Sequence, residues 1–367
     1  MKKLEKFDLT APGTSKLKDE IIHGAYIREG TMVAFPLCFP GITAQIPADE
    51  SHITALDVAA DGMIYGGTSG RATHLFVGMF HGATGMVFDM GVVKGANHCA
   101  VLCCGKKSFM ACVNGPSGGQ ILRRKFERLP FDLLQEWAFS RYPFETIETP
   151  FPRENIVHAV LNIPAEQMLV ATKKHLVSFD ISGNGNRVID EIPSSGRMAI
   201  ASHGKAFGLD QENTLWSYDF QTGALKRRAI GLPAGNWQNT MVTWGRDPVN
   251  GTLYIADNIG RLYSFREDTG FSDCLGSTGL APVNTMAVTF DGRVFGTCGN
   301  GISKIFCCNP TTSKVVQLGA AVSVIERRRY GYAFAEAVTG RDGQIIFGED
   351  DNLGHIWLYF PRIEKHQ

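Results

Sequence analysis

One strand-and-turn unit recurs along the chain and constrains its fold more than any other feature. Each copy reads as an apolar alternating strand, a tight turn, a second strand such as "IYGG", a short loop, a third strand such as "HLFVG", and a last strand. We place the first strands of the copies, 42 to 58 residues apart, at Ile53, His98, Ile156, Met198, Thr240, Thr285 and Phe334. A repeat of this length is the period of four-stranded propeller blades.

The turn between the first and second strands has the same chemistry in four copies. It reads Asp61-Gly62, Asn250-Gly251, Asp291-Gly292 and Asp342-Gly343. Such pairs supply the positive φ angles that tight hairpins require. The sequence therefore predicts an all-β fold, a seven-bladed β-propeller that takes up residues 1–367 as a single domain after an irregular N-terminal segment, 1–30.

The two ends of the repeat region and one interruption complete this prediction. The seventh copy stops one strand short, and we expect Thr31 to Pro40 to supply that strand, join the last blade and so remove the exposed sheet edges. Residues 129–154 break the period, and we interpret them as an insertion between the second and third blades. Long excursions from a rigid scaffold often carry function, although a plain packing role is equally compatible with the sequence.

Composition excludes several classes of partner. Lys plus Arg and Asp plus Glu both number 36, so the net charge is zero and nucleic acid is not an expected partner. No apolar run approaches the roughly 20 residues that span a bilayer, so no membrane association is expected. The start of the chain lacks the apolar region of a signal peptide, which predicts a cytoplasmic protein, or an exported one if the chain is a trimmed mature form.

The nine cysteines predict buried thiols. Their number is odd, and several lie in apolar runs such as "CAVLCC" and "KIFCC", which is typical of a reducing compartment and not of a disulfide framework. Their spacing does not match that of zinc ligands, so we predict no zinc site from these cysteines. We also predict no cofactor, and the sequence leaves open whether a structural metal ion is bound.

Propeller topology predicts which polar residues share one face. In a four-stranded antiparallel blade, the loop between the second and third strands lies on the same face as the link to the next blade. Arg71 and His74 should therefore share a face with Asn97 and His98. The same reasoning gathers further residues around the axis on this face, namely His158, Arg197, Trp237, Asn239, Asn284, Arg329, Tyr330 and Tyr332.

This set is rich in histidine, arginine, amides and aromatic rings and poor in carboxylates. Such side chains suit an anionic, hydroxyl-rich ligand. Hydrolysis of glycosides normally uses two carboxylates, whereas β-elimination requires a base and a group that stabilises the uronate carboxylate. The set favours elimination, although a histidine at a strand end is often structural and Trp237 can simply cap the core.

Several short motifs resemble those of a known family. The "GGTSG…HLF" hairpin, the "NH" that opens the second blade, "SRYPF", and the C-terminal "YGYAFAEAVTGRDGQIIFGEDDNLGHIWLYFP" are similar to those of seven-bladed β-propeller polysaccharide lyases. These are the ulvan lyases and the rhamnose–glucuronate lyases, which are related to propeller α-L-rhamnosidases. The resemblance implies a lyase that cleaves a rhamnose–glucuronate bond by β-elimination, and hence an anionic, uronate-containing oligo- or polysaccharide as its partner.

The resemblance also implies roles for particular residues. Two histidines on neighbouring blades and a tyrosine surround the bond in that family, and the matching residues here are His74, His98 and Tyr142, with His98 as the acid or base. Where the family has an arginine this chain has His158, so carboxylate neutralisation would fall to His158, Arg153 or the arginines at 327–329. An α-L-rhamnosidase-type hydrolase and a non-catalytic interaction propeller remain alternatives, and the sequence leaves the exact glycan and the oligomeric state open.

Overall fold

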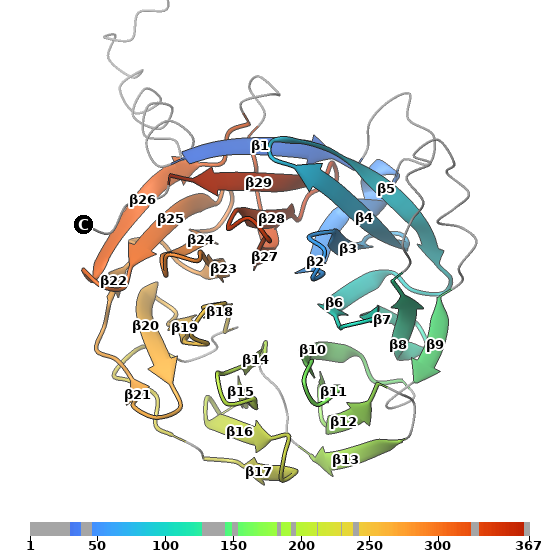
Figure 1. The fold of residues 1–367 in the computed structure, drawn as a ribbon, viewed down its shortest axis with the longest axis horizontal. Coiled ribbons are helices and arrows are strands. Elements are labelled where there is room, and N and C mark those ends of the chain that lie inside the picture. The colour runs from blue at the N-terminus through green and yellow to red at the C-terminus, as the bar shows by residue number, and fades with distance from the viewer. Residues whose placement is uncertain are drawn as a thin grey trace, which may run out of the picture.

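The protein forms a ring of seven antiparallel sheets around a central axis (Figure 1). The computed structural model describes residues 30–37, 46–126, 144–148, 153–181, 185–191, 196–210, 212–228, 230–237, 242–323 and 330–362. Figure 1 shows the first strand of each blade next to the axis and the last strand on the outside of the ring. The chain is therefore a seven-bladed β-propeller, as the repeat predicts.

The first four blades follow one another in chain order. The first blade contains β2 (His52–Val58), β3 (Ile64–Ser69), β4 (Thr73–His81) and β5 (Thr84–Val93). The second contains β6 (His98–Cys104), β7 (Ser108–Gly115), β8 (Gly118–Lys125) and β9 (Glu145–Glu148). The third contains β10 (Ile156–Asn162), β11 (Gln167–Thr172), β12 (Leu176–Asp180) and β13 (Asn186–Asp190), and the fourth contains β14 (Ala199–Ile200), β15 (Lys205–Leu209), β16 (Leu215–Asp219) and β17 (Ala224–Lys226).

The remaining three blades complete the ring. The fifth contains β18 (Trp244–Arg246), β19 (Leu253–Ala256), β20 (Arg261–Arg266), and the short β21 (Gly270–Phe271) and β22 (Gly276–Ser277), which both pair with β20. The sixth contains β23 (Val283–Val288), β24 (Val294–Cys298), β25 (Lys304–Asn309) and β26 (Lys314–Ala320). The seventh contains β27 (Phe334–Thr339), β28 (Ile345–Glu349), β29 (His355–Pro361) and β1 (Gly30–Pro36), and a short 3-10 helix, η1 (Ala48–Glu50), precedes β2.

The N-terminal strand closes the ring. β1 pairs antiparallel with β29, from Gly30 opposite Pro361 to Pro36 opposite His355. The last blade therefore combines three C-terminal strands with one N-terminal strand (Figure 1). This confirms the predicted closure, and it covers an edge that β29 would otherwise present to solvent.

The second blade corrects the predicted position of the insertion. β9 lies inside 129–154 and pairs with β8, with Thr146 opposite Leu122. The interruption therefore falls between the third and fourth strands of this blade and not between the second and third blades. Because β9 is four residues long and its sequence "ETIE" holds one apolar residue, no strand pattern marks it. Residues 127–143 lie outside the described part of the chain.

The hairpin glycines adopt the expected backbone conformation. Gly62, Gly251, Gly292 and Gly343 have φ angles of +90°, +74°, +81° and +81°. Each N–H donates to a carbonyl three or four residues earlier, as Gly62 does to Ala59 at 2.8 Å. The Asx-Gly pairs thus form the tight turns between the first and second strands.

A second glycine position repeats across blades and makes room for large side chains. Within the second and third strands of three blades, glycine lies opposite an aromatic residue, in the pairs Gly66 and Phe76, Gly208 and Trp216, and Gly296 and Phe306. A Cβ atom on Gly66 would lie only 2.0 Å from the ring of Phe76. The ring therefore covers the glycine, and both are buried in the blade.

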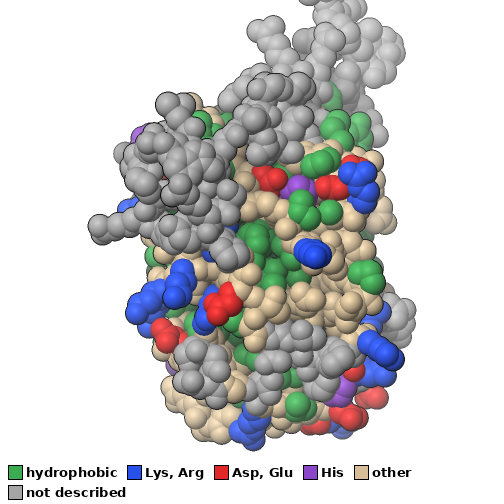
Figure 2. Space-filling view, turned by 90° about the vertical axis from the view of Figure 1, so that its right-hand side faces the viewer, with side chains coloured by type: hydrophobic (Ala, Val, Ile, Leu, Met, Phe, Trp, Pro, Cys, Tyr) green, Lys and Arg blue, Asp and Glu red, His purple; other side chains and the backbone are tan. Residues whose placement is uncertain are grey.

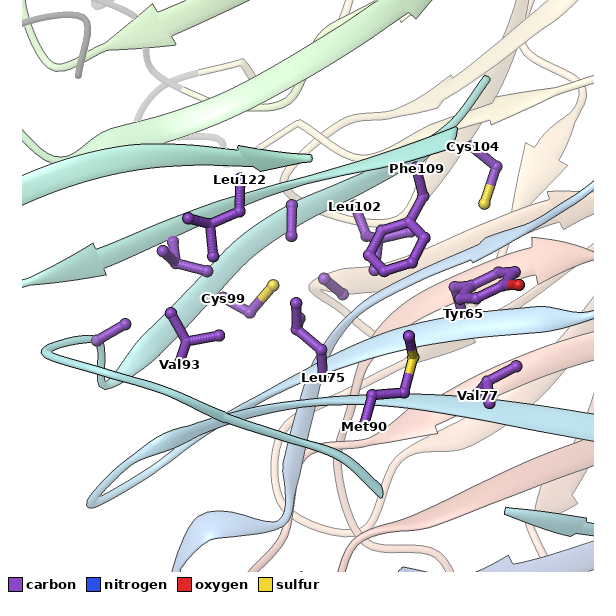
Figure 3. Packing of buried hydrophobic residues seen from close by; sticks show 14 of the residues in the cluster. Tyr65, Leu75, Val77, Met90, Val93, Cys99, Leu102, Cys104, Phe109 and Leu122 are labelled. Carbon is purple, nitrogen blue, oxygen red and sulfur yellow. The ribbon is translucent and has the colours of Figure 1, made fainter. Parts of the chain in front are cut away.

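Apolar packing between neighbouring blades forms the core. Figure 3 shows one such layer between the first two blades, where Leu75, Cys99 and Leu102 lie between Leu122 and Tyr65. Each propeller blade buries both of its faces against its neighbours, which explains the nearly continuous apolar runs in its inner strands. The cysteines of these runs, among them Cys99, are buried free thiols, whereas Cys274 is exposed.

The outer surface carries charges of both signs. Figure 2 shows one side of the ring, where basic and acidic side chains are scattered among neutral ones over the described residues that are visible. Among the described residues, no helix is long and apolar enough to cross a membrane, and no group of three or more His, Cys, Asp or Glu side chains is arranged to hold a metal ion.

Candidate functional site

The two faces of the propeller differ in the segments that form them. All inner strands run in the same direction along the axis. They begin on what we call the link face, which also carries the loops between second and third strands, and they end on the hairpin face, which carries the hairpins between first and second strands. His98 is the first residue of β6 and lies on the link face, whereas Cys104 ends β6 about 20 Å away on the hairpin face.

A chain of hydrogen bonds fixes the protonation of the His98 ring. Thr54 Oγ1 donates its only proton to the carbonyl of Cys99 at 2.7 Å. The 2.6 Å contact between Thr54 Oγ1 and Ser69 Oγ must therefore use the Ser69 proton. Ser69 Oγ accepts from the Cys99 N–H at 3.1 Å and lies 2.8 Å from His98 Nδ1. Because Ser69 has no second proton to give, His98 Nδ1 carries the hydrogen and donates it.

The other ring nitrogen of His98 is left as a base. In the neutral ring the lone pair resides on Nε2, which has no hydrogen-bond partner among the described residues. Desolvation lowers the pKa of His98 below its ordinary value, and the negative charge of Asp350 opposes this only in part. The ring is therefore neutral at pH 7, and its residue is exposed at the link face.

A second histidine lies beside this site. Asp350, whose charge acts on His98, accepts a 2.8 Å hydrogen bond from His52 Nδ1. Asn352 Oδ1 lies 2.7 Å from His52 Nε2. Asp350 and Asn352 belong to the loop between β28 and β29, so the first and last blades meet here. An acidic side chain close to a base can stabilise the imidazolium that forms when the base takes a proton.

His74 lies in a different environment. Its residue is 4% exposed, Nε2 lies 2.7 Å from Glu50 Oε2, and Nδ1 lies 2.9 Å from Asp89 Oδ2. Because carboxylates only accept hydrogen bonds, both ring nitrogens donate and the ring is an imidazolium. Burial lowers the pKa of His74, but its hydrogen bonds to Asp89 and Glu50 outweigh burial and raise the pKa above its ordinary value. His74 thus ties η1 to β4 and β5 inside the first blade.

Arg71, Asn97 and Arg153 are exposed residues of the link face. Arg71 Nε donates to Glu50 Oε1 at 2.7 Å, so Arg71 and His74 share one carboxylate. The carbonyl of Asn97 accepts the N–H of Gly70 at 3.0 Å, which joins the first blade to the second.

Four of the expected residues hold the scaffold or flank it. Trp237 is 8% exposed, packs in the core and donates its Nε1–H to the carbonyl of Pro233. Asn284 Nδ2 donates to the carbonyl of Gly299 at 3.0 Å, which connects the start of β23 to the loop after β24. Tyr330 is half-buried, and Tyr332 is 51% exposed on the link face. Three further expected residues, Tyr142, Asn239 and Arg329, lie outside the described residues.

His158 and Arg197 lie inside the space that the seven inner strands enclose, which we call the channel, and not at the rim of the link face. Both line a cavity of about 430 Å³ that also contains Glu336 and Asp57. Arg197 Nη1 donates to Glu336 Oε1 at 2.7 Å. Burial, followed by the charge of Arg197, lowers the pKa of His158 to about 3, so this ring is neutral. The cavity thus holds two acids beside these two expected residues.

An arc of exposed apolar side chains extends over the link face. It is formed by loops and links of the last three blades and consists of Ile259, Leu280, Ile302, Tyr332 and Leu353. The Ser303 N–H donates to the Tyr332 carbonyl at 2.7 Å, and the Asp350 N–H donates to the Ala333 carbonyl at 2.8 Å. These bonds connect the arc to Asp350 and hence to the surroundings of His98.

The sequence predicts that His98 lies on this face, but it does not indicate the residues that fix the protonation of its ring. Ser69 and Thr54 belong to generic repeat strands, and their relation follows only from the β2–β3 register, in which His52 lies opposite Ser69. The pairing of Asp350 with His52 joins residues 298 positions apart, so no local sequence pattern indicates it.

Comparisons with known proteins show the fold and no family. No family model matches the sequence, and no curated protein matches it. The chain is similar to the solved structure of streptogramin B lyase, with 10% identity, a TM-score of 0.64, and coverage of 90% of this chain and 98% of that one. It is also similar to the extracellular domain of a hybrid two-component system from B. thetaiotaomicron, with 12% identity and a TM-score of 0.59. That match covers 91% of this chain but only 40% of the other, and both likenesses establish a seven-bladed propeller alone.

Proposed function

We propose that the protein is a carbohydrate lyase that cleaves a rhamnose–glucuronate bond by β-elimination, with His98 as its base. The observation that carries this proposal is the hydrogen-bond chain that leaves a lone pair on His98 Nε2. A neutral histidine with a lowered pKa and a fixed tautomer meets the requirements for a base that removes a carbon-bound proton. One of the similar solved structures is itself named a lyase.

The proposed reaction accounts for each proton and bond. His98 Nε2 takes the proton on the carbon next to the uronate carboxylate, and the electrons of that C–H bond form a C=C bond. The C–O bond to the neighbouring sugar breaks, and the leaving oxygen takes a proton from the imidazolium of His98 or from Tyr142. The charge of Asp350 stabilises the imidazolium between the two steps.

The uronate carboxylate requires a cation on the same face. His158 does not suit this role, because its pKa of about 3 leaves it neutral and it lies inside the channel. Arg153 suits it better, since this exposed arginine is always charged and lies on the link face just before the third blade. The apolar arc that includes Tyr332 offers a surface for the methyl group and C–H face of rhamnose.

The activity assay follows the unsaturated uronate that only elimination creates. The full chain is incubated with rhamnose–glucuronate oligosaccharides, and the ultraviolet absorbance of the conjugated product is recorded. We expect absorbance to rise with the wild type, to be abolished in His98→Ala, and to be retained in His81→Ala. His81 is a matched control because it is an exposed histidine that ends β4, on the hairpin face and therefore away from the link face that carries His98.

The products separate the alternative functions. Release of free reducing rhamnose without an absorbance change would identify a hydrolase and refute elimination. Full activity of His98→Ala would remove His98 from the mechanism. No turnover of any uronate-containing glycan would favour a non-catalytic propeller.

A further inference from the structure

A cavity along the channel is lined by residues from both ends of an inner strand, from Arg197, just before β14, to Ser202, just after it, and His98 is not among its lining residues. Its volume is about 430 Å³, which is within the range of small-molecule sites. The last residues of the seven inner strands form a ring at the hairpin face, consisting of Val58, Cys104, Asn162, Ile200, Arg246, Val288 and Thr339. Arg246 is the one charged member of this ring, and it lines the cavity.

Arg246 offers hydrogen-bond donors that the described residues do not use. Its Nε donates to the carbonyl of Ile200 at 2.9 Å, which fixes the guanidinium across the gap between the fourth and fifth blades. Its two terminal nitrogens have no hydrogen-bond partner among the described residues. A guanidinium fixed in this way is suited to a bidentate carboxylate.

Asp57 lies one residue deeper, on the first blade, and lines the same cavity. The N–H of Val58 donates to its Oδ1 at 2.8 Å, and the N–H of Cys104 donates to its Oδ2 at 2.6 Å. Asp57 has no salt bridge to a cation among the described residues. Desolvation raises the pKa of Asp57 to about 6, which still leaves the group ionised in neutral buffer. A half-buried carboxylate without a charged partner attracts a cation.

Two further charges deeper in the cavity cancel each other. Arg197 pairs with Glu336 at 2.7 Å. The site thus presents a separate positive group, Arg246, and a separate negative group, Asp57, across one cavity. A ligand that is only anionic would meet Asp57 and Glu336, and a ligand that is only cationic would meet Arg246 and Arg197. A ligand that carries both charges can satisfy both unpaired groups.

The walls between these charges also present apolar side chains. The lining includes Leu56, Leu161, Met198, Ile200 and Trp244. Burial of apolar ligand surface on these side chains is favourable.

We propose that this cavity binds a small zwitterion of the amino-acid type, with its carboxylate on Arg246, its ammonium on Asp57 and an apolar side chain against Trp244. We expect binding here to be independent of the proposed lyase activity, because His98 does not line this cavity.

Calorimetry on the full chain tests this proposal. The standard L-amino acids are first ranked by thermal shift, and the best binder is then titrated alongside its methyl ester and its N-acetyl derivative. We expect the zwitterion to bind at least about tenfold more tightly than either derivative, because each derivative leaves Arg246 or Asp57 without a charged partner. Binding should also change the fluorescence of Trp244.

Variants assign the site. Arg246→Gln should weaken binding at least about tenfold, whereas Arg266→Gln, at an exposed arginine on an outer part of the same blade, should leave it unchanged. His98→Ala should also bind normally, which separates this site from the proposed lyase. The proposal is overturned if no standard amino acid binds at about 10 mM, if a derivative binds as well as the zwitterion, or if Arg246→Gln has no effect.

Discussion

Replacement of His74 by glutamine should weaken the first blade in a pH-dependent way. The imidazolium makes hydrogen bonds of 2.7 Å to Glu50 and 2.9 Å to Asp89, and its side chain is only 5% exposed. A charge-assisted hydrogen bond stabilises by about 1.5–3 kcal/mol, and removing one partner of a buried ion pair costs about 3–5 kcal/mol. Glu50 keeps its bond to Arg71, so we expect His74→Gln to lower the free energy of unfolding by about 3 kcal/mol.

The pH dependence distinguishes a charge effect from a packing effect. A histidine whose folded pKa is raised contributes stability that is fully present below its unfolded pKa and is lost as pH rises through the folded pKa. Its hydrogen bond to Glu50 lowers the pKa of that carboxyl, and this contribution is lost as pH falls through the folded pKa of Glu50. The difference between wild type and His74→Gln should therefore be large at about pH 6 and smaller at about pH 9.

Urea unfolding followed by tryptophan fluorescence measures this difference, because Trp216 and Trp357 are buried in the blades. His81→Gln serves as the control, since His81 is an exposed histidine on the same strand. A loss below about 1 kcal/mol, or an equal loss at both pH values, would refute an imidazolium held between two carboxylates.

Three further perturbations test other parts of the structure. Ser69→Ala removes the group that orients His98, and it should lower the proposed lyase rate about tenfold to a hundredfold in an absorbance assay while the far-ultraviolet circular dichroism stays unchanged. Among the described thiols, a maleimide should label exposed Cys274 first and leave Cys99 unlabelled in the native protein. The reason is that burial raises the pKa of the Cys99 thiol to about 12, and mass spectrometry identifies the labelled cysteine. Gly66→Ala would place a methyl group inside the aromatic ring that covers this glycine and should destabilise by about 1–3 kcal/mol in urea titrations, whereas Gly231→Ala meets open space and should have little effect.

The fold could be predicted from the sequence because each blade repeats local chemistry. Hairpin pairs such as Asp61-Gly62 specify a turn whatever the rest of the chain does, and alternating apolar residues specify strands. Prediction failed at β9, where four residues with one apolar side chain pair with β8 only through the tertiary fold. Propensity carries little information on a strand this short, and the partner strand supplies most of its stability.

The candidate site was less predictable because its chemistry depends on partners that are distant in sequence. Topology alone placed His98 and His74 on neighbouring blades, but it did not indicate that two carboxylates would bury and charge His74. The state of His98 depends on Ser69, 29 residues earlier, and on the charge of Asp350, which belongs to the last blade. A repeat pattern predicts where a strand begins, but it does not predict which proton a side chain at that position carries.

The parallel direction of the inner strands explains how one channel can hold two unlike environments. Every inner strand starts on the link face, so residues such as His98 gather there, and every inner strand ends on the hairpin face, where Arg246 and Asp57 lie. The seven residues of β6 separate these ends by about 20 Å, about twice the distance over which salt screens a charge at physiological ionic strength. Substitutions at one end should therefore leave the electrostatics of the other end unchanged. The double variant His98→Ala with Arg246→Gln should lose the absorbance signal as His98→Ala does, and it should bind the zwitterion as weakly as Arg246→Gln does.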